Sequence, residues 1–234
     1  MSEFEGKVVL VTGAAGALGA AVVDFFAAAG ALVVQFDVVA IHNGHPSRIC
    51  DLTDVDACRQ AVDAVIAEFG PVSVLANIAG GFAMGERVHE TTDKTWDFLM
   101  GLNARSVLNM ARAVIPGMLK NTTATGIGGA RGKVVNIGAG AGQKAGGRMG
   151  AYSASKSVVI RLTEAMADEL KGEGINVNCV LPSIIDTPRN RADMPDADFD
   201  AWVTPAAMAR VIGFLASGAA DPLHGVALPV SGLS

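Results

Sequence analysis

The sequence has few aromatic residues, no cluster of positive charge and no unbroken apolar run long enough to cross a membrane. Aromatic residues make up 5% of the chain and the formal net charge is -5, so it lacks the stacking surface and basic patch of nucleic-acid-binding proteins. The longest apolar region, residues 8–36, is interrupted by glycines and Asp24. The N-terminal MSEFEGK is acidic and lacks the layout of a signal peptide. We therefore predict a cytoplasmic protein that acts on a small molecule, without a membrane or nucleic-acid partner.

Cysteine is also scarce. The three cysteines, Cys50, Cys58 and Cys179, are odd in number and lie in apolar surroundings. A disulfide framework needs pairs of cysteines, so we predict buried, reduced thiols. Neither these residues nor the four histidines have the spacing of metal ligands, and we predict no metal site.

What the sequence does contain is a regular alternation of short apolar runs and helical patterns. The runs are β-branched and apolar on both faces, which is typical of parallel strands covered by helices on both sides. We expect strands at 7–12, 31–37, 47–51, 72–77, 133–138, 175–181 and 225–230. We expect helices at 17–29, 54–69, 93–119, 152–171 and 205–217. The order predicts an α/β fold: one Rossmann domain over residues 1–234, with a doubly wound, parallel, seven-stranded sheet flanked by helices. The glycine-rich residues 121–132 are predicted to form a surface loop.

The first strand leads into a glycine-rich turn and then a helix. The stretch VLVTGAAGALG places glycines at 13, 16 and 19. Gly13 permits the tight turn, Gly16 lets the backbone approach a pyrophosphate, and Gly19 lets helix and strand pack closely. Because free amides at the helix N-terminus bind phosphate oxygens, the turn predicts a dinucleotide site.

Two carboxylates follow the next strands. Asp37 ends the second strand, where it would accept hydrogen bonds from the ribose hydroxyls of adenosine and repel a 2'-phosphate. No positive charge stands at residues 36–39, so NAD(H) is favoured over NADP(H). Asp51 follows the third strand and could bind the adenine amino group, or could cap the next helix with Thr53 and Asp54. The fourth strand ends in small residues, 77–80, that would let the backbone pass close to a ribose.

Tyr152 and Lys156 are one helical turn apart and therefore lie on one face of a helix. A tyrosine with a pKa near 10 transfers protons poorly at neutral pH. A nearby ammonium favours the phenolate, so we expect Lys156 to lower the pKa of Tyr152 towards the working range. The pair predicts a proton-transfer site.

Taken together, TGAAGALG, Asp37, CDLTD, NIAG, Asn103, YSASK and LPSIIDTP occur in the order found in short-chain dehydrogenase/reductases, which the chain resembles over its full length. The resemblance implies an NAD(P)-dependent oxidoreductase, usually a homotetramer or homodimer built partly on the helices near 101–119 and 152–171. It implies that Tyr152 is the acid/base, that Lys156 binds the nicotinamide ribose and tunes Tyr152, and that Asn103 holds a water of the proton relay. The cofactor site that it implies comprises Gly13, Ala15, Gly16, Ala17, Leu18, Gly19, Asp37, Asp51, Leu52, Asn77, Ala79, Gly80, Tyr152, Lys156, Pro182, Ile185 and Thr187.

The chain departs from the family pattern at two positions. Ala17 stands where the family has a glycine, and Ala139 stands where it has the catalytic serine that polarises a substrate carbonyl. Loss of such a donor costs about 10²–10³ in rate. Both departures resemble one branch, the dihydropteridine reductases, as do AGGFAMG at 79–85 and the segment 181–205. In that branch NADH reduces a conjugated dihydropterin that has no ketone to polarise.

We expect the substrate to contact Phe82, Ala139, Gln143 and Met149. Phe82 either stacks on a flat substrate ring or simply anchors its loop. Gln143, Lys144 and Arg148 either replace the missing donor or are solvated. The segment 186–203 is predicted to be a mobile substrate lid, whose Arg189 and Arg191 either hold the substrate or solvate the lid.

Three functions fit these residues. The first is NADH-dependent hydride transfer to a small conjugated acceptor, with a quinonoid dihydropterin as the candidate. The second is an NAD-dependent alcohol or carbonyl dehydrogenase in which another residue replaces the serine. The third is an inactive NAD-binding homologue, against which the complete set of Tyr152, Lys156 and Asn103 stands.

Overall fold

A computed structural model describes residues 3–121 and 129–233 of the chain. It contains one seven-stranded sheet in the order β3-β2-β1-β4-β5-β6-β7, and every neighbouring pair is parallel. All seven predicted strands are confirmed. Their bounds are β1 Val8–Thr12, β2 Leu32–Asp37, β3 Ser47–Ile49, β4 Val72–Asn77, β5 Gly132–Ile137, β6 Ile175–Pro182 and β7 Ala227–Val230.

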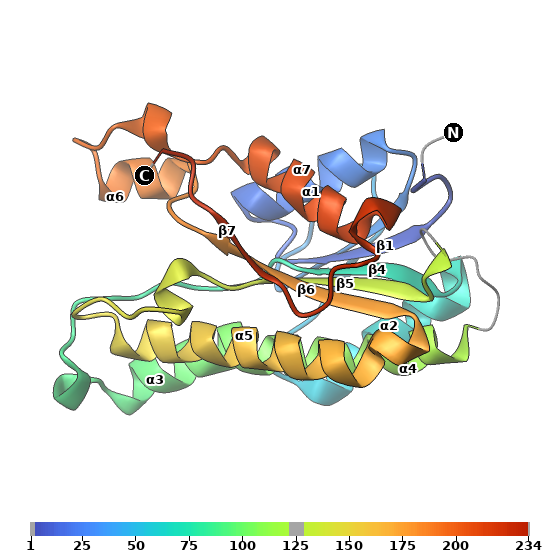
Figure 1. The fold of residues 1–234 in the computed structure, drawn as a ribbon, viewed down its shortest axis with the longest axis horizontal. Helices are drawn as coiled ribbons and strands as arrows, with labels where there is room; N and C mark the ends of the chain where they lie inside the picture. The colour runs from blue at the N-terminus through green and yellow to red at the C-terminus, as the bar shows by residue number, and fades with distance from the viewer. Residues whose placement is uncertain (1–2, 122–128, 234) are drawn as a thin grey trace.

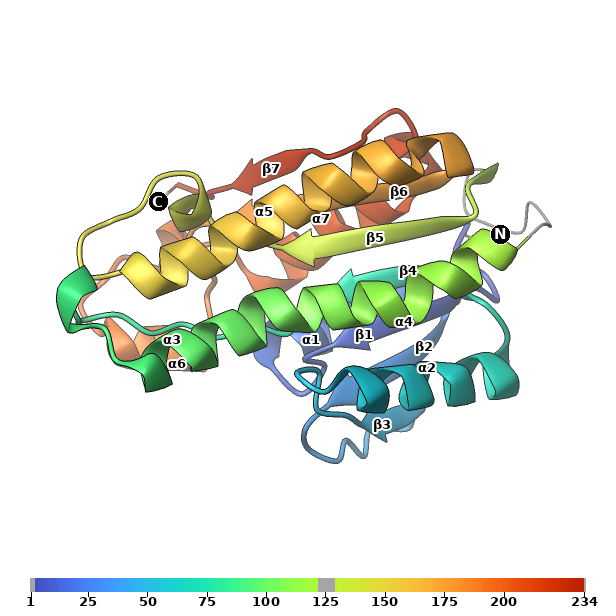
Figure 2. The same cartoon turned by 90° about the horizontal axis from the view of Figure 1, so that it is seen from below.

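Helices cover both faces of the sheet. The α-helices are α1 Ala17–Ala28, α2 Val55–Phe69, α3 Asp93–Leu99, α4 Ser106–Lys120, α5 Gly150–Leu170, α6 Pro188–Asp193 and α7 Pro205–Ala216. In Figure 1, α1 and α7 lie above the sheet, and α2, α4 and α5 lie below it. Figure 2 shows α4 and α5 running side by side across the lower face. The predicted doubly wound Rossmann architecture is therefore confirmed.

A hydrophobic core fills each space between sheet and helices. The lower core contains Val62 from α2, Met110 from α4 and Ile160 from α5. The upper core contains Phe26 from α1 and Ile212 from α7. Because all residues of β1, β4, β5 and β6 are buried, the apolar runs that predicted the strands serve both cores.

Three details differ from the sequence-based expectations. The helix expected at 93–119 is interrupted by a π-helical turn at Met100–Arg105, and such turns are frequent at functional sites. A short helix, α6, lies within the segment 186–203. Most of the expected loop at 121–132 lies outside the described residues, but Gly132 belongs to β5 and Ala130 is buried. The last part of that segment is therefore not a surface loop.

The expected environment of the cysteines is confirmed, because all three are buried. None of the described helices is long and apolar enough to cross a membrane. Among the described residues, no group of His, Cys, Asp or Glu is placed to hold a metal ion.

Candidate active site

The glycine-rich turn between β1 and α1 can be built only with glycine at two of its positions. Gly13 has φ +64°, and a Cβ there would lie 2.7 Å from the Cα of Ala79. A Cβ at Gly19 would overlap the carbonyl oxygen of Gly13. At Gly16, by contrast, the nearest atom to a Cβ would be at 3.4 Å. The turn thus packs tightly on β4 and leaves Gly16 on its open side.

The N-terminus of α1 is free to bind an anion. Gly16 is its N-cap and no side chain caps the helix, so the first-turn amides of Ala17, Leu18 and Gly19 have no partner within the helix. Three free amides above a close-packed glycine turn suit the pyrophosphate of a dinucleotide. The residues present therefore fit the cofactor that the sequence predicts.

Asp37 lies beside this turn. Its Oδ2 accepts a hydrogen bond of 3.0 Å from the backbone N–H of Ala15, and its Oδ1 accepts one of 2.8 Å from Val38. These bonds fix the carboxylate between the end of β2 and the glycine turn. The structure thus brings together Ala15 and Asp37, two of the residues predicted to form the cofactor site.

Asp51 and Asp54 have different partners. The Asp51 carboxylate accepts hydrogen bonds from the N–H and the hydroxyl of Thr53, at 2.8 and 2.7 Å, and these bonds lower the pKa of Asp51. Asp54 is the N-cap of α2 and accepts from the backbone of Asp56 and Ala57. The sequence left open whether Asp51 helps to cap the next helix. In the structure the side chain that caps α2 is that of Asp54. Leu52 is buried between them, and its carbonyl accepts a bond from Asn109.

The ends of β1 and β4 are joined by a side chain that the sequence analysis missed. The Thr12 hydroxyl accepts hydrogen bonds of 3.0 and 3.1 Å from the backbone N–H groups of Ile78 and Ala79. Asn77 points the other way, because its Nδ2 donates to Asn136 Oδ1 on β5 at 2.9 Å. The buried Asn77 Oδ1 has no partner. Thr12 carries no sequence signal beyond its place before Gly13.

Tyr152 and Lys156 lie in the first two turns of α5, where burial controls both. Lys156 Nζ donates a 2.8 Å hydrogen bond to the Ile137 carbonyl at the end of β5. Burial lowers the pKa of the Lys156 ammonium to about 8 and raises the pKa of the Tyr152 phenol to about 12. The expectation that the ammonium lowers the pKa of Tyr152 is therefore wrong for this structure, because desolvation of the phenol dominates.

Asn103 lies in the π-helical turn, and its side chain makes three hydrogen bonds. Its Oδ1 accepts from the N–H of Gly81 at 2.9 Å, while its Nδ2 donates to the Gly81 carbonyl at 3.0 Å and to Ser155 Oγ at 2.9 Å. A Cβ at Gly80 would lie 3.0 Å from Asn103 Oδ1 and 3.2 Å from Lys156 Nζ. The structure thus brings Asn103 and Lys156 around Gly80, where only glycine fits comfortably.

The end of β5 offers no hydroxyl beside Tyr152. Ala139 is buried, and its backbone is extended. A side chain at position 138 cannot supply the hydroxyl instead, because a Cβ there would lie 2.6 Å from a methyl group of Leu181 and 2.8 Å from the sulfur of Cys179. A donor for a substrate carbonyl would have to come from another segment.

The other predicted substrate residues lie around the start of α5. The ring of Phe82 is half exposed and meets the Tyr152 ring edge-on, with centroids 4.8 Å apart. Met149 is the N-cap residue of α5, and Gln143 is exposed on the preceding loop. The edge-on contact shows that Phe82 touches the candidate proton donor, whichever of its two expected roles applies.

The segment 186–203 is held by its own contacts. Pro182 ends β6, Ile185 forms a bridge to Val203, and Thr187 caps α6. Arg191 donates to both carboxylate oxygens of Asp186, at 2.5 and 2.8 Å, and its guanidinium lies 4.6 Å from the centre of the Phe199 ring. Arg191 therefore braces the segment, whereas the Arg189 side chain is 84% exposed.

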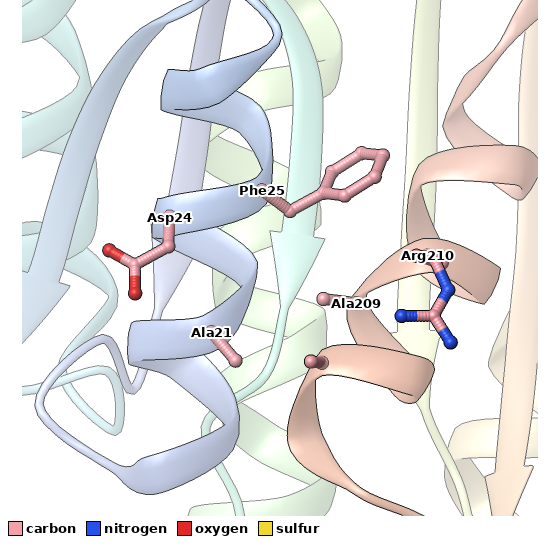
Figure 3. Close-up of a pocket in the computed structure, with 6 residues that line it drawn as sticks. Ala21, Asp24, Phe25, Ala209 and Arg210 are labelled. Atoms are coloured by element: carbon pink, nitrogen blue, oxygen red, sulfur yellow. The ribbon is translucent and has the colours of Figure 1, made fainter.

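A groove of about 380 Å³ lies elsewhere, between α1 and α7. Figure 3 shows Phe25 on α1 extending towards α7, which carries Ala209 and Arg210, whereas Asp24 points away from α7. It opens on the face of the sheet opposite α5, so it is separate from Tyr152. The candidate site residues lie instead around the carboxyl ends of β1, β4 and β5, where this type of sheet binds its ligands.

Comparison with known proteins agrees with this geometry. Residues 7–198 match the family described as short chain dehydrogenase. The chain belongs to this family. It is therefore an NAD(P)-dependent oxidoreductase of the short-chain type, and it binds a nicotinamide cofactor.

The relatives have several substrates. The chain is 30% identical to a 3-oxoacyl-acyl-carrier-protein reductase, FabG, of Thermotoga maritima, over 97% of both chains. It is 32% identical to a 2-dehydro-3-deoxy-D-gluconate 5-dehydrogenase of Escherichia coli, over 97% of this chain and 95% of the relative. The structure of carveol dehydrogenase from Mycobacterium avium in complex with NAD has a TM-score of 0.86 and 25% identity, and the match covers 98% of each chain.

Proposed function

We propose that this enzyme uses NADH to reduce a small conjugated acceptor that has no ketone to polarise, with a quinonoid dihydropterin as the candidate. The observation that supports this is that the chain keeps both Tyr152 and Lys156 but has Ala139, which offers no hydroxyl, after the end of β5. Position 138 is blocked by Leu181 and Cys179. A conjugated acceptor spreads the incoming charge over its own ring, so it does not need the missing donor.

In this proposal the bound nicotinamide supplies the hydride, and Tyr152 supplies the proton that completes the reduction. Lys156 would bind the nicotinamide ribose from its buried place beside Ile137, and Asn103 would hold a water of the proton relay near Gly80. A pKa of about 12 keeps Tyr152 protonated at neutral pH, which is the form that donates a proton, and in the complex the Lys156 ammonium would have to lower that pKa towards the working range. The edge of Phe82 would border the acceptor next to the phenol.

We also propose a preference for NAD(H) over NADP(H). Asp37 would bind the adenosine ribose and repel a 2'-phosphate. The nearest basic residue on the neighbouring strand, Arg48, is aligned with Phe36 in the sheet, but its guanidinium is paired with Glu68 and also donates to the Ser47 carbonyl at 2.9 Å. It is therefore not free to bind a phosphate. Comparing KM for NADH and NADPH, in the wild type and in Asp37→Ala, tests this preference.

Three further proposals follow from the resemblance. Residues 1–234 form one domain, in which 186–203 acts as a substrate lid. The enzyme is a homodimer or homotetramer built on α4 and α5, the two helices that lie side by side on the lower face (Figure 2). We place it in the cytoplasm.

A second candidate is a carbonyl or alcohol dehydrogenase. What favours it is the set of relatives, which includes the FabG reductase and a D-threitol dehydrogenase of Mycolicibacterium smegmatis, 31% identical to this chain. Gln143 and Lys144 are exposed on the loop before α5, and either side chain would have to replace the missing hydroxyl.

The test is NADH oxidation by the pure protein with a quinonoid dihydropterin, beside a panel of ketones and quinones. We expect rapid oxidation with the pterin, and we expect Tyr152→Phe to lose it by about 10²-fold or more. Turnover confined to ketones would reject the proposal and favour the second candidate. Pterin reduction that survives in Tyr152→Phe would reject the role of the phenol.

A further inference from the structure

Arg148 has an unusual backbone. Among residues 3–121 and 129–233 it is the one non-glycine residue with a positive φ, at +61°. Side chains other than glycine rarely adopt this conformation, and residues that do so cluster at functional sites. Arg148 lies four residues before Tyr152, in the loop that leads into α5. Its conformation therefore bears directly on how the helix presents the phenol.

Two hydrogen bonds join Arg148 to Gly85, which also has a positive φ, at +124°. The N–H of Gly85 donates to the Arg148 carbonyl at 2.9 Å, and Arg148 Nη1 donates to the Gly85 carbonyl at 3.0 Å. We call this pair of bonds the bridge. The guanidinium is thus directed at the backbone of residues 82–86 and not at a substrate.

The bridge fixes residues 82–86 over the start of α5. Phe82 is three residues from Gly85, and its ring meets Tyr152 at 4.8 Å. On the other side of Gly85, Val88 is in contact with the helix start, since a Cβ at Gly150 would lie 2.8 Å from a methyl group of Val88. A small cavity of about 80 Å³ remains between the two segments, lined by Ala83, Met84, Glu86, Thr91, Thr95, Arg148, Met149, Gly150 and Ala151.

We propose that Arg148 is a positioning residue that acts through Gly85: it holds Phe82 against Tyr152 and so keeps water away from the phenol. Residues 81–87 belong to no helix or strand. The segment is held at Gly81 by Asn103 and at Glu86 by Thr92 and Thr95, and the bridge holds the residues between these two anchors. Without the bridge the residues between these anchors would loosen, and water would reach Tyr152 through the small cavity, which is already partly open. The inference rests on the proposed function only in treating Tyr152 as the proton donor.

The chain offers an unusually clean readout, because Tyr152 is its one tyrosine. Protein labelled with ¹³C at the phenolic carbon of tyrosine gives a single signal, whose position follows ionisation of Tyr152 without any substrate. Burial raises the pKa of Tyr152 to about 12, so the wild type should stay protonated between about pH 9 and 11, where an unburied tyrosine ionises.

Three variants separate the bridge from the general fold. Arg148→Gly removes the guanidinium but adopts the positive φ freely. Gly85→Ala weakens the bridge at its other residue. An added Cβ meets no atom within 4 Å, so the substitution acts only by straining the positive φ of residue 85. The control is Gly147→Ala, next to Arg148, where a Cβ also meets nothing and φ is not positive. Circular dichroism confirms that each variant is folded at each pH.

We expect the pKa of Tyr152 to fall by about one unit in Arg148→Gly and in Gly85→Ala, because hydration of a buried phenol lowers its pKa. Gly147→Ala should titrate like the wild type. An unchanged titration in both bridge variants would overturn the proposal. An equal shift in the control would overturn it too, because the effect would then belong to the whole loop.

Kinetics supply the second readout. With NADH and a quinonoid dihydropterin, we expect kcat of Arg148→Gly to fall about tenfold and the alkaline limb of its pH profile to move to lower pH, with KM for NADH unchanged. A profile that keeps the wild-type alkaline limb would contradict the proposal. If the wild type reduces no pterin, the proposed acceptor fails, while the titration still decides on Arg148.

Discussion

A buried lysine lies at each end of β5, Lys133 in the strand itself and Lys156 on α5, and the two ammonium groups have different partners. Lys133, at the start of the strand, has a fully buried side chain. Its Nζ donates to Asn176 Oδ1 at 2.9 Å and forms an ion pair with Asp221. Lys156, beside the other end, is 4% exposed and donates to one carbonyl, that of Ile137. The charge of Lys133 is paired with the Asp221 carboxylate, whereas the charge of Lys156 has only the neutral carbonyl of Ile137 as a partner.

The difference separates a structural lysine, Lys133, from Lys156, the lysine proposed to act in the reaction. Around Lys133, the amide of Asn176 also binds the carbonyls of Asp221 and Leu223, at 2.8 and 3.1 Å, so the charge ties β5 and β6 to the turn before β7. Around Lys156, burial is not offset by a carboxylate, and the pKa falls to about 8. An ammonium held at such a pKa is ready to interact with an incoming cofactor, at a cost in stability.

Replacing Lys156 should have the largest effect on activity. Lys156→Met keeps the volume of the side chain but removes the charge and the bond to Ile137. We expect NADH oxidation to fall by about 10³-fold, the middle of the range for groups that serve proton transfer. The matched control is Lys133→Met at the far end of the strand, which should keep kcat per folded molecule. Equal losses of kcat in both variants would contradict the distinction between the two ends.

The same variant should be more stable than the wild type, and by an amount that depends on pH. The pKa of Lys156 falls from 10.5 to about 8 on folding, so between these values the unfolded chain binds more protons and stability rises with pH. Below about pH 8 the full penalty applies, about 3 kcal/mol. We therefore expect Lys156→Met to exceed the wild type by up to that amount at pH 7.

Urea unfolding at several pH values checks this expectation. The advantage of Lys156→Met should shrink steadily between pH 8 and 10, as the wild-type ammonium loses its proton in the folded state. Above pH 10 ionisation of Tyr152 in the unfolded chain lowers the stability of both proteins, because its pKa is raised on folding, so it does not account for a change in the difference between them. A difference that stays constant from pH 7 to 10 would mean that Lys156 is not titrating in this range.

At the other end of β5, removing the carboxylate should destabilise the protein. Breaking a buried pair by removing one partner costs about 3–5 kcal/mol. Asp221 is 37% exposed, so solvent screening reduces the expected loss for Asp221→Asn to about 2 kcal/mol. The control is Asp168→Asn, whose pair with Lys171 is solvent-exposed and should contribute nothing measurable. Urea unfolding at pH 7 compares the two, and equal midpoints would contradict the prediction.

These contrasts also show how far the sequence could lead. The seven strands were predictable because each is a short apolar run, and the glycine turn and Tyr152–Lys156 pair because their spacing is local. The ion pair of Lys133 could not be predicted, because its partner, Asp221, is 88 residues away in the sequence. The break at Met100–Arg105 was missed because a single glycine, Gly101, does not mark the end of a helix, and α6 was missed although Thr187 and Pro188 mark its start, because six residues are too few to show a helical period. The direction of the Tyr152 pKa depends on burial, which only the folded chain shows.

The smallest effect is expected at position 139, next to the end of β5 that carries the function. Ala139 has φ -165°, an extended conformation that serine also adopts, so Ala139→Ser adds one hydroxyl with little strain. If the acceptor is conjugated, kcat/KM for its reduction should change by less than about threefold, because the acceptor has no ketone oxygen for the new hydroxyl to polarise. Reduction of a ketone, by contrast, should rise by up to about 10²-fold. Steady-state kinetics of the wild type and Ala139→Ser on both acceptors test this prediction. If kcat/KM rises strongly for ketones and neither protein reduces pterin, the enzyme is better described as a carbonyl dehydrogenase.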